Sequence, residues 1–549
     1  MREGLPVRTD RARFNWLLEQ TRLWIKYFHT ISVLELVEPT AERERMRNHL
    51  LEDVLAWPEW SGQGSYDLST GELAVCLSGA LRFLPARLSE PMKEGLEAVL
   101  RERVLGPYEK LVPSISGETE AVWWWKHSGN WGAVCNAGAY CTALVLASEK
   151  VAASAWEGLE SFVGDLPADG GSFESVSYWQ FGYRYLTYAL LFRRVCGKEL
   201  PEMLQKPPLA EGTRFFTAFI SGTASVGFGD CSFVPPEALL LRFCDLVGDA
   251  PGRRRLEEVL IAYLQADKPS VNGARYIWNQ PREAQSLLFL EGEKGRLPEP
   301  RPKVTCFPET GWASLRNGPL LLGFRAGDNT GAHAMRDQLA VNVAFEGTSM
   351  LRYTENHPYT AGWFDDHGES TRELYFEGQS ISKNTIAING IGQIRSGDIR
   401  LRPLEKGAEA EAAELYPAFV IRVRRRVLLQ EDGFLVQDEI VTTEPCFHEI
   451  RFFSDGAIET DGRESVLVRV GGYRLGLQCA AGTDLAVRVL DVAPSIGVRE
   501  GWRMVRVLTR HAVDASVITT RLRPHFPVKA GGDGTLETET GQFDSVFQQ

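Results

Sequence analysis

The sequence predicts an α+β protein with two domains, a helical domain followed by an antiparallel β-sandwich. The chain has 549 residues, which is long for one domain and sufficient for two full hydrophobic cores. Apolar residues recur at three- and four-residue steps in the first part and at every second residue from about Cys306 onward. Gly, Pro, Glu and Arg dominate residues 292–303, so we place the two domains at 1–300 and 301–549.

The helical pattern begins at residues 11–28, where the apolar spacing is that of an amphipathic helix. The same pattern recurs at 41–55, 69–83, 90–104, 132–146, 152–163, 182–195, 235–246 and 254–266. Gly and Pro separate these segments, and the connections between them are short. Many helices of similar length joined in this way favour helix pairs stacked in a ring or a solenoid.

The second part is rich in short β-segments separated by Gly, Asp and Asn. They occupy residues 320–325, 339–345, 385–388, 419–429, 433–441, 465–470 and 502–508. Glu431-Asp432-Gly433 stands between two of them and predicts a hairpin turn. Strands that follow one another without intervening helices predict a large antiparallel β-sandwich.

The composition excludes several functional classes. A net charge of −12 argues against a general nucleic-acid binder, which needs a basic surface. No apolar run approaches the roughly 20 residues that span a bilayer, so we expect no membrane partner. The polar N-terminus shows no secretory signal, and the nine cysteines are dispersed without a CxxC pair. We therefore expect a cytoplasmic protein, or a periplasmic or secreted one if a signal peptide has been removed.

The densest group of chemically active residues lies at 121–140. Three consecutive tryptophans, Trp123 to Trp125, precede His127, and Asn130-Trp131 opens a predicted helix. Aromatic faces stack on sugar rings, and an asparagine amide both donates and accepts hydrogen bonds. The alternative is that the tryptophans are core residues and that Asn130 only caps the helix.

A second group lies at 169–185, where a turn with two glycines precedes Glu174, Tyr178, Tyr183 and Arg184. A phenol beside a cation can serve as a base, although these aromatic residues can equally pack into a helical core.

A third group is the loop 327–337, which places His333 next to Arg336 and Asp337, directly before a strand. A histidine in a glycine-containing loop is more typical of a functional residue than one in an apolar stripe.

Taken in order, these groups resemble the heparinase II/III-like polysaccharide lyases. Asn130-Trp131 with Cys135 and Gly138 resembles the Asn-Trp motif of that family. Asp169-Gly170-Gly171 followed by Glu174 and Tyr178 resembles its acidic-Gly-Gly turn. The segments 66–72, 333–337 and 380–385 resemble one of its toroid helix starts, its H-x-H-x-D loop and its S-T-x-x-H-N-T segment. The resemblance implies an α/α toroid, an incomplete helical barrel, in front of a heparinase II/III-like β-sandwich.

The resemblance also implies a reaction, β-elimination in a uronic-acid-containing glycan. It assigns Asn130 to neutralise the substrate carboxylate and makes Tyr178 and His333 the candidate acid–base pair. Tyr183 is the reserve for Tyr178. The residues that we expect to bind substrate are His127, Trp125, Trp131, Glu174, Tyr183, Arg184, Arg336 and Arg372. Five points stay open: which of Tyr178 and His333 is the base, the particular uronate glycan, endo or exo action, the oligomeric state, and whether the site is active.

No metal and no cofactor are expected. In family members with a structural zinc ion in the sandwich, the ligands would fall near Met335, Tyr353 and Lys383, and none of these is a plausible zinc ligand. A Lys383 ammonium in place of the ion is a hypothesis.

Two other functions fit the same residues. A glycoside hydrolase on this fold would use two carboxylic acids, for which Asp169 and Glu174 are available. A non-catalytic sugar-binding protein would have lost turnover.

Overall fold

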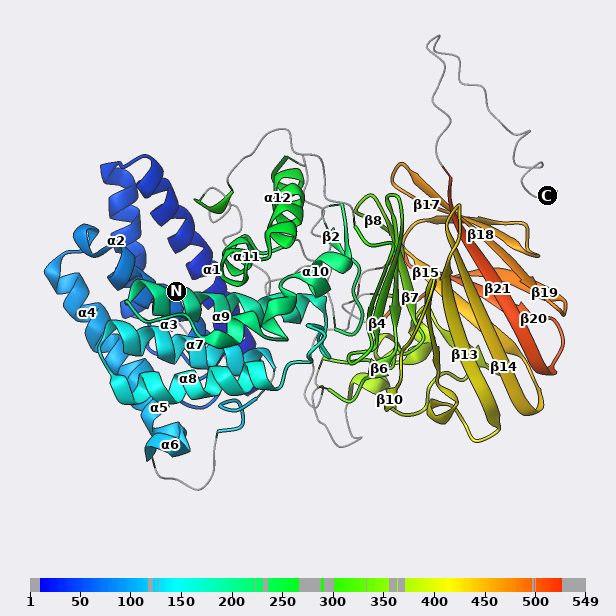
Figure 1. The fold of residues 1–549 in the computed structure, drawn as a ribbon, viewed down its shortest axis with the longest axis horizontal. Helices are drawn as coiled ribbons and strands as arrows, with labels where there is room; N and C mark the ends of the chain where they lie inside the picture. The colour runs from blue at the N-terminus through cyan, green and yellow to red at the C-terminus, as the bar shows by residue number, and fades with distance from the viewer. Residues whose placement is uncertain are drawn as a thin grey trace, which may run out of the picture. The chain divides into compact units, whose positions relative to one another are not determined.

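The computed structural model describes residues 10–116, 122–127, 129–222, 224–230, 236–265, 288–290, 301–331, 333–354, 363, 371–495, 498 and 500–525. The chain forms two compact units, which we call the helical unit and the β unit (Figure 1). The helical unit consists of residues 1–217 and 231–300, and the β unit of residues 218–230 and 301–549. Helices first and antiparallel sheets second confirm the predicted fold class.

The described helices of the helical unit follow the order of the chain. They are α1 (Asp10–Val37), α2 (Ala41–Leu55), α3 (Leu68–Phe83), α4 (Glu90–Leu100), α5 (Gly106–Leu111), α6 (Pro113–Ser116), α7 (Asn130–Val145), α8 (Glu149–Gly164), α9 (Val176–Val195), α10 (Arg214–Ala218), α11 (Leu240–Val247) and α12 (Ala250–Gln265). Short helical turns are η1 (Pro85–Arg87), η2 (Arg101–Leu105), η3 (Glu202–Gln205) and η4 (Leu209–Glu211). None of the described helices combines the length and the hydrophobicity that a bilayer crossing requires.

Local sequence explains where these helices begin. The side chains of Thr40, Asp67, Ser89 and Ser175 accept hydrogen bonds from backbone N–H groups in the first turns of α2, α3, α4 and α9. Because Ser175 caps α9, this helix begins at Val176, six residues before the predicted start at 182.

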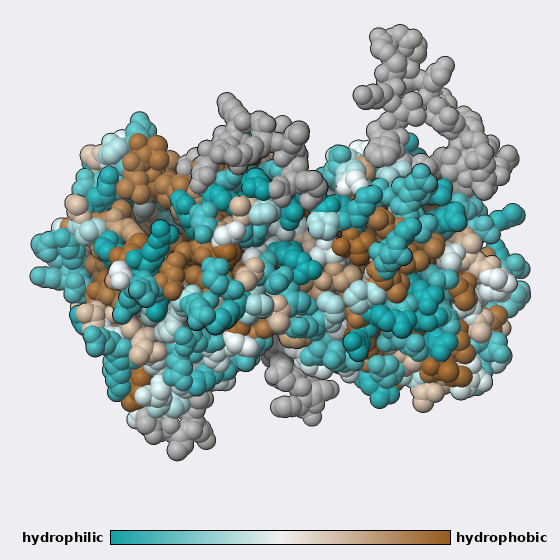
Figure 2. All heavy atoms as spheres, viewed as in Figure 1, coloured by the Kyte–Doolittle hydropathy of each residue, from teal (hydrophilic) through white to brown (hydrophobic). Residues whose placement is uncertain are grey.

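Helices α3 and α7 are buried over most of their surface and pack closely against each other. A Cβ atom at Gly138 would lie 2.6 Å from the carbonyl oxygen of Gly71, so this approach depends on glycine. The surface of the unit is largely hydrophilic, with separate hydrophobic areas, one of them over the turn between α1 and α2 (Figure 2).

The β unit is antiparallel throughout its described sheets. Its strands are β1 (Ile220–Ser221), β2 (Ala224–Ser225), β3 (Val304–Phe307), β4 (Trp312–Asn317), β5 (Leu320–Arg325), β6 (Gly327–Asp328), β7 (Val341–Phe345), β8 (Thr348–Leu351), β9 (Ile386–Ile388), β10 (Asp398–Ile399), β11 (Arg402–Leu404), β12 (Gly407–Glu411), β13 (Val420–Leu429), β14 (Phe434–Cys446), β15 (His448–Ser454), β16 (Ala457–Thr460), β17 (Ser465–Val470), β18 (Tyr473–Ala481), β19 (Leu485–Asp491), β20 (Arg503–Thr509) and β21 (Val513–His525). Short helical turns are η5 (Thr371–Leu374), η6 (Phe376–Gly378), η7 (Ser380–Ser382) and η8 (Ala413–Leu415).

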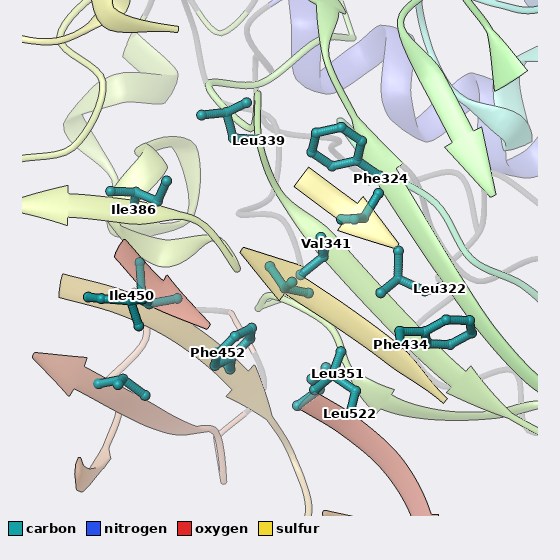
Figure 3. Packing of buried hydrophobic residues seen from close by; sticks show 14 of the residues in the cluster. Leu322, Phe324, Leu339, Val341, Leu351, Ile386, Phe434, Ile450, Phe452 and Leu522 are labelled. Carbon is teal, nitrogen blue, oxygen red and sulfur yellow. The ribbon is translucent and has the colours of Figure 1, made fainter. Parts of the chain in front are cut away.

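Three larger sheets share one apolar core. Their strand orders are β3-β4-β5-β7-β8, β11-β12-β13-β14-β21-β18-β17-β16 and β19-β20-β15-β9. Side chains from all three meet in the cluster of Figure 3, among them Leu322, Phe434 and Ile450. The predicted hairpin at Glu431-Asp432-Gly433 is present, since Leu429 pairs with Phe434.

Residues 218–230 belong to the β unit, whereas the predicted boundary places them in the helical domain. Strands β1 and β2 pair with each other within it. Phe219 and Phe228 each contact the buried ring of Trp312 edge-on. A Cβ atom at Gly323 would lie 2.9 Å from the Val226 side chain, so β5 has a glycine where the segment crosses it. These contacts join residues that are far apart in the sequence, so the local hydrophobic pattern does not predict them.

Candidate active site

Two neighbouring helix starts position the main candidates of the helical unit. Asn130 is the first residue of α7, and Tyr178 is the third residue of α9. A Cβ atom on Gly129, just before α7, would lie 3.2 Å from Oε1 of Glu174, just before α9, so the two helices begin side by side. Helix N-termini carry partial positive charge, and a pair of them favours a bound anion.

Asn130 retains hydrogen-bonding capacity that a structural asparagine would use. Its side chain is only 5 % exposed, yet within the described part of the chain its amide has no hydrogen-bond partner. Asn136 in the same helix donates to the carbonyl oxygens of Trp125 and Gly132 and accepts from Tyr108. The helix-capping alternative for Asn130 is also disfavoured, because Gly129 holds the cap position.

His127 lies three residues before the start of α7 and is half-buried. The backbone N–H of Gly129 donates to its Nδ1 at 2.9 Å. In the neutral ring the hydrogen therefore stands on Nε2, which makes that nitrogen the donor.

The three consecutive tryptophans have different roles. Trp124 packs against Tyr66 and Tyr108 in the core. Trp125 is buried, and its Nε1 donates to the carbonyl oxygen of Ser154 at 3.2 Å, which disfavours the predicted contact with substrate.

Trp123 is the exposed member of the three, with 53 % of its surface accessible. Its ring lies 5.0 Å from that of Trp131 and 5.3 Å from that of His127. Trp131, a predicted binding residue, stacks on Phe14 at 5.6 Å. Of the three tryptophans, Trp123 is thus the one with an exposed ring face on which a sugar could stack. The sequence alone could not distinguish it from its two neighbours.

The turn before α9 has the conformation that its glycines predict. Gly170 has φ +75°, and a Cβ atom there would lie 2.7 Å from the Glu211 side chain. The Asp169 carboxylate accepts from the N–H of Gly171 at 2.9 Å, so it already serves the turn. Tyr178 follows in the first turn of α9 and is 6 % exposed.

Tyr183 and Arg184, the other candidates on α9, lie in the core. The Tyr183 ring stacks on Trp179 at 4.0 Å, and burial raises the pKa of Tyr183, which opposes its use as a base. Arg184 is 2 % exposed and forms an ion pair with Glu237 at 3.3 Å. Neither placement supports contact with substrate, because aromatic and charged residues on a buried helix face look the same in sequence as those lining a site.

His333 belongs to the β unit, where Asp230 orients it. Asp230 Oδ2 lies 3.1 Å from His333 Nδ1, and the Asp230 N–H donates to the His333 carbonyl oxygen at 2.8 Å. Asp230 is 103 residues away from His333, so the local sequence around either residue does not indicate this contact.

Both predicted arginines of the β unit lie at this loop. Arg336 forms an ion pair with Glu373 of η5, and Arg372 donates to the Ala334 carbonyl oxygen at 2.6 Å. Both are half-buried, so each combines a structural contact with partial exposure.

The residues at the implied zinc position do not fit a zinc ion. Met335 is buried, Tyr353 donates to Asp337 at 3.0 Å, and the Lys383 ammonium lies 4.1 Å from the centre of the Tyr353 ring. Zinc sites use thiolate, imidazole and carboxylate ligands, and an ammonium group would repel the ion. Among the described residues no three His, Cys, Asp or Glu side chains come together as a metal-binding group.

Comparison with solved structures shows a shared fold. Heparinase III matches with a TM-score of 0.65 and 13 % identity over 95 % of this chain and 79 % of that one. Heparan sulfate lyase from Pedobacter heparinus matches with a TM-score of 0.54 and 11 % identity over 96 % and 78 %. Chondroitin AC lyase from Streptomyces coelicolor matches with a TM-score of 0.52 and 11 % identity over 96 % and 81 %. No family model and no curated protein sequence matches the chain.

Proposed function

We propose that this protein is a polysaccharide lyase that cleaves a uronic-acid-containing glycan by β-elimination. The observation that carries the proposal is the pair of adjacent helix starts with Asn130 and Tyr178 in their first turns. The fold shared with heparinase III, heparan sulfate lyase and chondroitin AC lyase supports an acidic polysaccharide as the substrate class.

The reaction removes the proton at C5 of the uronate and expels the oxygen at C4. Charge builds up on the uronate carboxylate as the proton leaves, and the Asn130 amide, which donates to none of the described residues, can stabilise it. The two helix N-termini add partial positive charge at the same place.

Tyr178 is the proposed base. A phenol needs nearby positive charge to lose its proton near neutral pH, and its place beside the two helix starts supplies such charge. His333, oriented by Asp230, is the candidate for the acid that protonates the leaving oxygen. Arg336 and Arg372 remain candidates for binding substrate carboxylate or sulfate groups.

The test is absorbance near 235 nm during incubation with a panel of uronate polysaccharides and oligosaccharides. Each elimination leaves a C4=C5 double bond conjugated to the carboxylate. We expect a rise with the native protein and a loss of about 100-fold or more in rate for Tyr178→Phe. Asn130→Ala should lose about as much, because it removes charge stabilisation. Tyr183→Phe is the matched control, since it removes a phenol from the core of the same helix.

Two outcomes would contradict the proposal. New reducing ends without absorbance would mean hydrolysis and would direct attention to Glu174, since Asp169 is engaged in its turn. Binding to a uronate glycan, measured by calorimetry, without any cleavage would favour the non-catalytic alternative.

A further inference from the structure

Lys383 is a buried cation of the β unit that the proposed reaction does not use. Its side chain is 0 % exposed and follows η7. Its Nζ donates to the Glu377 carbonyl oxygen at 2.7 Å and lies over the Tyr353 ring. A buried ammonium is unfavourable unless nearby groups compensate for the lost hydration, so its neighbours indicate what its charge does.

Carboxylates from three segments influence the charge of this ammonium, although none of them forms an ion pair with it in the described structure. Asp337, Glu377 and Asp230 act on its charge, in decreasing order. Burial lowers the pKa of Lys383 to about 8, and the three carboxylates oppose that shift. Asp337 Oδ1 and Glu377 Oε2 are buried and make no hydrogen bond in the described structure. The ammonium therefore supplies positive charge to acids that the hydrogen-bond network leaves partly unsatisfied.

Two of these carboxylates tie the His333 loop to the 229–230 segment. Asp337 Oδ2 accepts from the Gly229 N–H at 2.6 Å and from the Tyr353 hydroxyl at 3.0 Å. Asp230 contacts His333 through its carboxylate and through its backbone N–H. Asp230 therefore holds the 333–337 segment at His333, and the bonds of Asp337 hold its other end. A shift of either carboxylate would move the His333 ring.

We propose that Lys383 is a positioning residue for His333, an internal cation that acts through Tyr353. Its ammonium lies over the Tyr353 ring, and the Tyr353 hydroxyl donates to Asp337 at the end of the His333 loop. The role of His333 in catalysis rests on the proposed function, whereas the positioning of its ring is a property of the β unit by itself. This role also explains why the residues here do not fit a zinc ion, since the chain supplies the positive charge from its own side chain.

The experiment uses the full chain with Lys383→Met, which keeps the length of the side chain and removes its charge. Lys406→Met removes an exposed lysine of the same unit and is the matched control. The chain is labelled with ¹⁵N in its histidine rings, and the His333 signals are assigned with His333→Gln. At pH 7 we expect the His333 ring signals to shift or broaden in Lys383→Met and to stay unchanged in Lys406→Met.

Two further measurements separate positioning from scaffolding. Because loss of the charge leaves the buried acids Asp337 and Glu377 without this cation, the midpoint of thermal unfolding should fall together with the shift of the His333 signals. On a substrate that the native protein cleaves, kcat should fall by about 10- to 100-fold with little change in KM. A lower unfolding midpoint with unchanged His333 signals would make Lys383 part of the scaffold and would overturn the inference.

The inference and the proposed function fail in different ways. If no uronate glycan is cleaved, the proposed function falls, and the His333 signals still decide the role of Lys383. If cleavage is normal and the His333 signals match in both variants, only the role of Lys383 falls. Should Lys383→Met not fold, the ¹⁵Nζ spectrum of the native protein serves instead. A charged Lys383 at pH 7 would support the inference, and a neutral amine would overturn it.

Discussion

The two units compensate their buried cations in different ways. In the helical unit the main partner is an acid on another segment: Arg22 binds Glu72 at 2.5 Å and Arg47 binds Glu35 at 2.6 Å. Arg47 also donates to the carbonyl oxygen of Arg87. In the β unit Arg325 donates instead to the backbone carbonyl oxygens of Thr310 and Asp328. Lys383 and Arg425 bind carbonyl oxygens too, although Arg425 also pairs with Asp438.

The difference follows from where free carbonyl groups exist. Helices use nearly all of theirs internally, so a cation buried between helices needs a side-chain partner. Loops between strands leave carbonyl oxygens unpaired, and a buried cation can satisfy several at once. The Arg22–Glu72 pair therefore joins two helices, whereas the bonds of Arg325 and Lys383 fix the shape of loops.

The largest expected effect comes from breaking a helical pair. Arg22→Met leaves the Glu72 carboxylate buried and unpaired, so we expect the free energy of unfolding to fall by about 3–5 kcal/mol. The double variant Arg22→Met/Glu72→Leu should recover most of that loss, because the isolated charge is gone. Urea denaturation of the three chains measures both effects.

The matching change in the β unit is Arg325→Met. Its partners are backbone carbonyls, so no second substitution should restore the lost stability in the same way. If Arg22→Met/Glu72→Leu recovered none of the stability lost in Arg22→Met, the two units would not differ in this respect.

An intermediate effect is expected on acidification of the β unit. His448 is 0 % exposed, its Nδ1 lies 2.7 Å from Ser516 Oγ, and burial lowers its pKa from 6.5 to about 4. Between these two pKa values the His448 imidazole is protonated in the unfolded chain and neutral in the folded chain. The free energy of unfolding therefore falls as the pH drops through this range. From pH 7 to pH 5 we expect a loss of about 1–2 kcal/mol from this group.

Urea denaturation of the native chain and of His448→Gln at both pH values measures this loss. Other groups titrate in both chains, so the difference between them isolates His448. Equal losses in the two chains would show that His448 does not titrate in this way.

The smallest effect is expected at Tyr183. Its hydroxyl is buried and has no hydrogen-bond partner in the described structure, so Tyr183→Phe removes an unsatisfied group. We expect a change within about 0.5 kcal/mol, or a slight gain, by urea denaturation. A loss above about 2 kcal/mol would mean that the hydroxyl binds something in the native protein.

Local pattern predicted the fold class because helix and strand periods are visible in short windows. Alternate positions in β13 place Arg422, Arg424 and Arg426 on one partly exposed face. They pair there with Glu439 and with the buried Glu409. The pattern did not show that Arg425, between them, is buried against Asp438.

The candidate site was only partly visible for the same reason. Asn130 and Tyr178 stand in recognisable local contexts, whereas the link between Asp230 and His333 joins residues that are far apart in sequence. Burial also distinguishes neighbours that look alike in sequence, as it does for Trp123 and Trp125. Only the tertiary structure separates such pairs.

The close contact between Gly71 and Gly138 fixes the position of α7 at a point away from the candidate site. Asn130 stands eight residues before Gly138 on the same helix, about 12 Å along its axis at the α-helical rise per residue. An added methyl group at Gly138 would push α7 away from Gly71 and tilt the helix. The tilt would displace the side-chain amide of Asn130 at the helix N-terminus. Variation at a buried glycine thus offers a route to tune the candidate site without altering any residue that touches substrate.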